Sequence, residues 1–153
     1  MPSTILLTLH LLFAVIWVGG MFFAYMALRP TAAEQLEPPT RLKLWTGVFG
    51  RFFPYVWLAV ILLPITGYMM VDTFYQGFQQ APKYIHIMNG LGIVMILIYL
   101  HVFFAPYKRL KQAVANEDWP TGGKKLAQMR ILIGINLVIG LLVVIVAAAG
   151  RYM

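Results

Sequence analysis

The sequence predicts an all-α integral membrane protein, a four-helix bundle built as a single domain over residues 1–153. Hydrophobic residues make up 61% of the chain and charged residues 11%, against about 45–50% and 25% in soluble domains. The charges also fall between four long apolar segments and not within them. So few charges cannot cover a soluble surface. The absence of cysteine excludes disulfide frameworks, thiolate metal sites and iron–sulfur clusters.

Each apolar segment is long enough to cross a bilayer, whose hydrocarbon core of about 30 Å needs roughly 20 helical residues. In chain order the segments cover about residues 4–28, 52–71, 84–105 and 131–150. Backbone polar groups in lipid must be satisfied within the segment, so each segment is predicted to be a helix. We expect the first to be a retained helix and not a signal peptide, because no basic region precedes it.

The loops determine the predicted orientation. Residues 29–51 and 106–130 together hold ten of the twelve lysines and arginines, and the remaining two are Lys83 and Arg151. Because basic loops stay in the cytoplasm, these two loops are predicted to face it, with both termini in the periplasm of a bacterial inner membrane. Arg51 and Arg130 are expected to anchor helices at the interface, although either could neutralise an anionic ligand. The formal charge of +7 is thus explained without nucleic acid.

The first cytoplasmic loop is expected to contain a short interfacial helix of its own. Prolines at 30, 38 and 39 precede a run in which Leu42, Trp45 and Phe49 alternate with basic residues. Trp45 suits the aromatic belt of a membrane interface.

The three histidines are the candidate functional residues, because ionisable groups inside a membrane are costly and mark function by default. His10 and His86 are expected roughly 9–10 Å and 13 Å from the bilayer midplane on the periplasmic side, and His101 roughly 9 Å on the other side. Two neutral imidazoles at similar depth suit the axial positions of a haem iron, and also copper or zinc. A membrane histidine can alternatively serve only as a hydrogen-bond partner for a neighbouring helix.

The residues around this pair favour haem. Trp17 follows His10 by two helical turns, Gly20 comes next, and Asn89 follows His86 by one turn. Bulky aromatics and glycines beside a histidine suit a porphyrin slot. The predicted cofactor-binding residues are His10, His86, Trp17, Gly20 and Asn89. His101 is a candidate second site for a proton, a quinone or a haem shared in a homodimer, and no catalytic residue is indicated.

The sequence therefore predicts a b-type haem protein of the membrane with bis-histidine ligation. Electron transfer, or an oxidoreductase activity, would use a quinone in the bilayer or a periplasmic partner. Copper handling is the alternative, with Met26 and Met88 as thioether donors. A metal-free structural or assembly role is also open.

Several runs resemble the CopD-like membrane proteins of proteobacteria. In the first segment these are LH at residues 9–10, WVGGMFF at 17–23 and RP at 29–30. Later runs are YIHIM at 84–88 and HVFFAPY at 101–107, followed by Arg130, Asn136 and Gly140. This resemblance implies a helical membrane protein associated with copper transport or haem b.

The first segment is also similar to that of the HemJ-type protoporphyrinogen oxidases, four-helix membrane proteins that bind haem b. His10 matches the histidine of that pattern. The lysine expected early in the third helix is missing, and residues 88–90 occupy its region. A porphyrinogen-oxidising enzyme is therefore the second alternative.

The predicted topology can be tested with reporters fused to the C-terminus. We expect alkaline phosphatase, which needs the periplasm, to be active there, and green fluorescent protein to be dark. Silent alkaline phosphatase together with bright fluorescence would show that the bundle is inverted.

Overall fold

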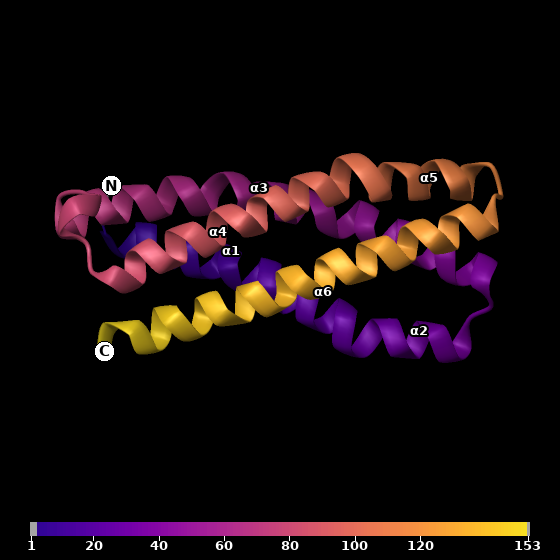
Figure 1. Ribbon diagram of the computed structural model, residues 1–153, viewed down its shortest axis with the longest axis horizontal. Coiled ribbons are helices and arrows are strands. Elements are labelled where there is room, and N and C mark those ends of the chain that lie inside the picture. The colour runs from indigo at the N-terminus through magenta and orange to yellow at the C-terminus, as the bar shows by residue number, and fades with distance from the viewer. Residues whose placement is uncertain (1–2, 153) are drawn as a thin grey trace.

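A computed structural model of the chain describes residues 3–152. Four long helical rods lie side by side, and no strand occurs within these residues (Figure 1). The rods cover Ser3–Gln35, Pro38–Tyr75, Lys83–Ala115 and Trp119–Tyr152, and each is long and apolar enough to cross a membrane. The predicted four-helix membrane fold is thus confirmed. Both chain ends lie at one end of the bundle (Figure 1), and the side of the membrane that they face stays a prediction.

Two of the rods contain a wide π-helical turn next to a proline. The elements in order are α1 (Ser3–Phe23), η1 (Ala24–Leu28), α2 (Arg29–Gln35), α3 (Pro38–Tyr75), η2 (Phe78–Gln80), α4 (Lys83–Val102), η3 (Phe103–Tyr107), α5 (Lys108–Ala115), α6 (Trp119–Ala149) and η4 (Gly150–Tyr152). Pro30 follows η1, and Pro106 lies inside η3. Proline lacks the N–H and crowds the carbonyl four residues earlier, which accounts for the widened turns.

The structure corrects the separate interfacial helix predicted in the first loop. Residues 38–51 are the first turns of α3, which continues without a break to Tyr75. The buried positions of α3 recur every three or four residues across the predicted boundary: Leu42, Trp45, Phe49, Phe53, Val56 and Val60. The predicted boundary came from the charge at Arg51, but arginine and lysine are good helix formers. The first, third and fourth rods likewise continue beyond their predicted segments, over residues 29–35, 106–115 and 119–130.

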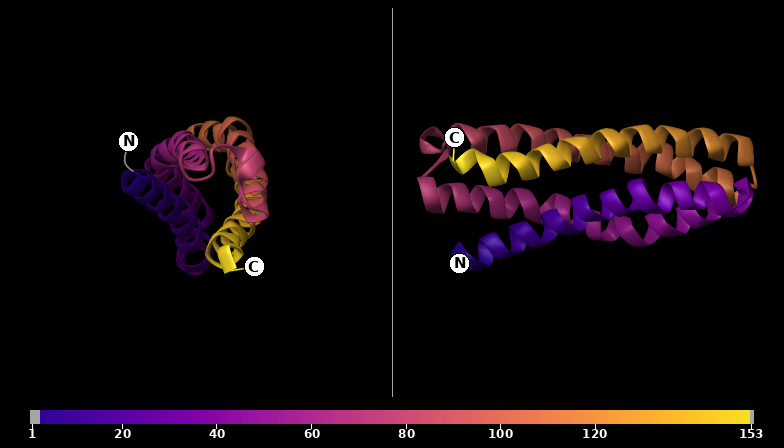
Figure 2. Two further views of the ribbon diagram at one scale, coloured as in Figure 1. Left: turned by 90° about the vertical axis from the view of Figure 1, so that its left-hand side faces the viewer. Right: turned by 90° about the horizontal axis from the view of Figure 1, so that it is seen from below.

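The bundle consists of two tightly packed helix pairs. α1 packs along α3 and α4 along α6, while α6 also contacts α1 and α3 (Figure 2). Aromatic rings around Phe53 join the pairs: its ring centroid lies 5.4 Å from that of Tyr99 and 4.8 Å from that of Tyr107, both edge to face. The Tyr99 hydroxyl also donates to the Phe53 carbonyl at 3.3 Å. Edge-to-face aromatic pairs stabilise contacts beyond the area that they bury.

Large apolar side chains cover the outside of the bundle. Exposed examples from the four rods are Val15, Phe23, Leu58, Leu97, Phe104, Val138 and Ile145. A continuous apolar exterior of this kind suits a lipid environment.

Gly140 provides a test of the packing between the pairs. A Cβ atom at this position on α6 would stand 3.0 Å from Val18 Cγ2 and 3.1 Å from Met95 Cε. We expect Gly140→Leu to lower the thermal unfolding temperature in detergent, at a cost of about 1–3 kcal/mol from overpacking. Gly92→Leu on α4 is the control, since a Cβ at Gly92 would meet nothing within 4 Å. Equal losses in both variants would contradict the close contact at Gly140.

Candidate functional site

His10 lies on α1 with its imidazole against α3. The ring is half-buried, and its Nδ1 is 2.9 Å from the hydroxyl oxygen of Thr66. The next residue on α3, Gly67, makes room for the ring, because a Cβ there would stand 3.2 Å from His10 Cε1. The pair Thr66-Gly67 therefore fixes the position of the imidazole.

The hydrogen bond between Thr66 and Nδ1 also bears on which ring nitrogen carries the proton, because its direction depends on the tautomer of the imidazole. The Thr66 hydroxyl donates to the Leu62 carbonyl at 2.7 Å, so its oxygen is free only to accept. We therefore assign the proton of the neutral imidazole to Nδ1, which leaves the lone pair on Nε2. A histidine oriented through its other ring N–H is the arrangement found in metal-binding sites.

His86 belongs to a different cluster, near the start of α4. Its side chain is exposed, and its ring centroid is 5.6 Å from that of Phe78 in η2. Phe78 in turn meets Tyr68 of α3 edge to face at 5.5 Å, and the Tyr68 hydroxyl donates to Asn89 Oδ1 at 2.7 Å. The predicted site residue Asn89 thus helps to fasten α4 to α3.

The contacts of His10 and His86 are on opposite sides of α3. His10 contacts Thr66, whereas the His86 cluster contacts Tyr68. A helix turns about 100° per residue, so two consecutive steps point the side chains of these two α3 residues in nearly opposite directions. This geometry gives no support to a shared haem iron, and the bis-histidine pairing stays a prediction. His101 lies apart from both, exposed in the last turn of α4.

Trp17 and Gly20 line a cavity of about 290 Å³ between the helix pairs, which we call the inner cavity. Trp17 is buried and meets Tyr99 edge to face, with ring centroids 6.3 Å apart. Gly20 gives space to the ring of Phe52, a role that the sequence had suggested for a porphyrin. No histidine is among the residues that line this cavity, so the described residues do not fit a haem with histidine ligands there.

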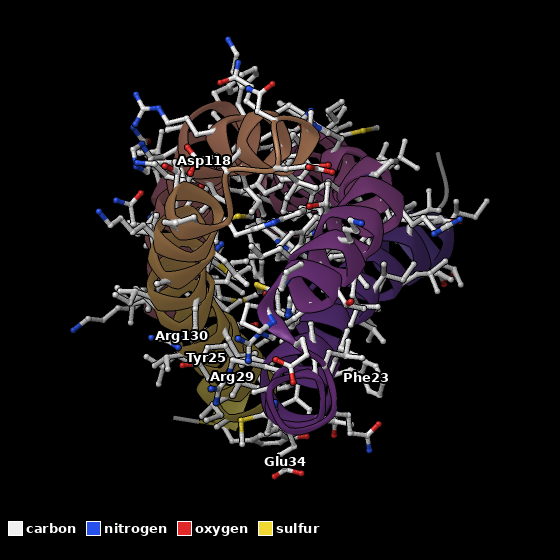
Figure 3. All side chains as sticks on the ribbon, turned by 90° about the vertical axis from the view of Figure 1, so that its right-hand side faces the viewer. Phe23, Tyr25, Arg29, Glu34, Asp118 and Arg130 are labelled. Carbon is white, nitrogen blue, oxygen red and sulfur yellow. The ribbon has the colours of Figure 1, made fainter. Side chains whose placement is uncertain are left out.

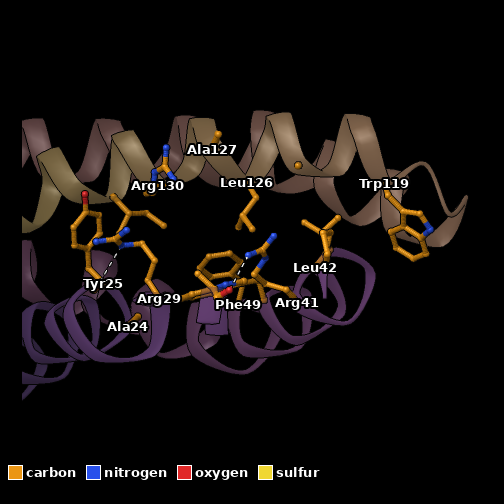
Figure 4. Close-up of a pocket in the computed structure, with 15 residues that line it drawn as sticks. Ala24, Tyr25, Arg29, Arg41, Leu42, Phe49, Trp119, Leu126, Ala127 and Arg130 are labelled. Atoms are coloured by element: carbon orange, nitrogen blue, oxygen red, sulfur yellow. Dashed lines mark hydrogen bonds between the residues drawn. The ribbon is translucent and has the colours of Figure 1, made fainter. Parts of the chain in front are cut away.

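A second cavity, of about 270 Å³, lies at the end of the bundle that holds the α2–α3 and α5–α6 connections. Arg29, Arg41 and Arg130 line it, so we call it the arginine cavity (Figure 4). It did not emerge from the sequence as a site, because α2, α3 and α6 each contribute one arginine. Of the two arginines that the sequence analysis named as able to neutralise an anionic ligand, Arg130 lines this cavity and Arg51 does not.

The donor atoms available for a metal are limited. Among residues 3–152, no three His, Cys, Asp or Glu side chains gather in one place. His10 Nε2 is the imidazole donor that the structure orients. Met70 lies one helical turn beyond Thr66, on the same face of α3, and is half-buried. The candidate metal ligands on this face are therefore the His10 imidazole and the Met70 thioether.

Comparison with known proteins agrees with this membrane architecture. The family model described as CopD, copper resistance protein D, matches residues 46–149. An uncharacterized protein of Aquifex aeolicus (strain VF5) is 29% identical over 134 residues, which cover 86% of this chain and 87% of that protein. No solved structure matches the chain. The match of the family model over most of the chain shows that this protein belongs to the CopD family.

Proposed function

We propose that this protein binds monovalent copper within the membrane and takes part in copper handling. The description of its family, copper resistance protein D, supports this reading. The structural observation behind it is His10, whose Nδ1 is held by Thr66 at 2.9 Å so that Nε2 is left to bind a metal. Copper is the cargo in this proposal and not a permanent cofactor.

The available donors suit monovalent copper better than other metals. Thioether groups are soft ligands that select Cu(I), and imidazole is also a copper ligand, whereas structural zinc usually takes four ligands from cysteine, histidine and carboxylates. The chain has nine methionines and no cysteine. Met70 is the thioether placed on the His10 face of α3. A site with few ligands also releases its ion readily, which suits transfer.

Copper affinity measured by competition with a chromophoric Cu(I) chelator tests the proposal. We expect His10→Ala to weaken binding by at least about tenfold. Thr66→Val keeps the shape of the side chain but removes the acceptor for Nδ1–H, and should weaken binding by about tenfold, as outer-shell changes commonly do. His101→Ala is the matched control, because it removes an exposed histidine from the same bundle. Affinity that falls equally in His101→Ala, or stays unchanged in His10→Ala, would contradict a site at His10.

An absorption spectrum of the same purified protein separates copper from haem. We expect a protein without a Soret band, both oxidised and after reduction by dithionite. A Soret band with split α and β bands on reduction, lost in His10→Ala and in His86→Ala, would establish bis-histidine haem b in its place.

A further inference from the structure

We propose that the arginine cavity binds the anionic head group of an amphiphile whose apolar body extends into the inner cavity. The shared chemistry of the head is a phosphate-type oxyanion. The proposal is independent of copper binding at His10, because neither cavity includes that residue.

The first argument is charge. Three arginines line the arginine cavity, and no acidic side chain is among its lining residues. Viewed from this end of the bundle, Arg29, Tyr25 and Arg130 lie near one another, while Glu34 points away from them (Figure 3). Asp118 caps α6 by accepting from the Thr121 amide at 3.3 Å. The positive charge of the cavity is therefore available to bind an anionic ligand.

The second argument is that the arginines are held in place but keep donors to spare. Arg29 Nε donates to the Tyr25 carbonyl at 3.1 Å, and its guanidinium carbon lies 4.5 Å from the centre of the Tyr25 ring. Arg41 Nη1 donates to the Ala33 carbonyl at 3.4 Å (Figure 4). A guanidinium group has five N–H donors and binds phosphate in a bidentate manner. Each group can thus hold an oxyanion without giving up its present bond.

The third argument is that the two cavities adjoin each other. The arginine cavity and the inner cavity share Ala24, Phe49 and Ile133 as lining residues. The former has a volume of about 270 Å³ and the latter about 290 Å³, so together they fall within the range of about 300–1,000 Å³ that is usual for ligand sites. A charged cavity thus adjoins an apolar one, in the order of polarity that a charged head on an apolar body requires.

A buried polar atom without a hydrogen-bond partner is independent support for a ligand in the inner cavity. Asn136, 3% exposed, lines this cavity and donates through Nδ2 to the Met95 carbonyl at 3.2 Å. Its buried Oδ1 has no hydrogen-bond partner within the described residues. Buried acceptors are nearly always satisfied, so this atom suits a hydroxyl on the body of the ligand.

The tryptophans provide a local readout for the test. Trp45 and Trp119 line the arginine cavity, and Trp17 lines the inner cavity. The full chain in detergent is titrated with phosphatidylglycerol carrying brominated acyl chains, which quench nearby tryptophan, and in parallel with brominated phosphatidylcholine. We expect at least fivefold tighter apparent binding of the anionic lipid. Equal binding of the two lipids by the unaltered protein would overturn the proposal.

Paired double variants separate the cavity from general surface charge. Arg29→Gln with Arg41→Gln should abolish the preference for phosphatidylglycerol. The control is Arg51→Gln with Arg109→Gln, which removes two exposed arginines outside the lining of both cavities, and it should keep the preference within twofold. Helix content from circular dichroism must match in both. An equal loss of the preference in the control would overturn the proposal.

Competition with inorganic phosphate identifies the source of the head group. Relief of quenching at millimolar phosphate supports the proposal with free phosphate as a ligand. Quenching that phosphate does not relieve supports it with the lipid as the ligand. Because His10→Ala leaves both cavities intact, the titration can be repeated in that variant, so that a failure of copper binding and a failure of this proposal are distinguishable.

Discussion

The aromatic cluster around Phe53 is the contact on which the rest of the bundle depends. Lipid surrounds the helices with groups as apolar as their own, so the hydrophobic effect does little to bring the two helix pairs together. Packing and hydrogen bonds must do so. Phe53 meets Tyr99 and Tyr107 edge to face, and the Tyr99 hydroxyl reaches the Phe53 carbonyl. Within the second pair, Asn136 of α6 donates to the Met95 carbonyl of α4.

The same rings explain why the bundle contains space. Bulky aromatics at the junction hold the pairs apart, and the small side chain of Ala24 in the cavity wall adds little volume to fill the space between them. Phe53 and Tyr99 form part of the wall of the inner cavity, and Phe49 lies between this cavity and the arginine cavity as a lining residue of both. The contact that joins the pairs is thus also a boundary of the cavities, so core packing and ligand space cannot be altered separately here.

The sequence could predict those features of the fold that depend on a single segment of the chain. Apolar length and bracketing charges were sufficient for the four membrane helices, and residues 29–51 and 106–130 do lie together at one end of the bundle. The pairing of His10 with His86 could not be tested in this way, because depth along a helix says nothing about the direction in which a side chain points. The α3 residue that contacts His10 and the α3 residue that contacts the His86 cluster are two positions apart, so their side chains point in nearly opposite directions. The arginine cavity could not be predicted for a related reason. Its three arginines come from three different helices, and the sequence of one segment does not show how the helices pack together.

The continuity of α3 places the two proposed sites toward opposite ends of the bundle. Thr66, the partner of His10, and Arg41 of the arginine cavity lie on this one helix. They are about 25 positions apart, or about 38 Å at 1.5 Å per residue, which exceeds the hydrocarbon core of about 30 Å. At that separation the Coulomb energy between a bound cation and a bound anion is only about 0.4 kcal/mol at an effective dielectric constant of about 20, so any substantial coupling between the sites would have to pass mechanically along α3 through Phe53.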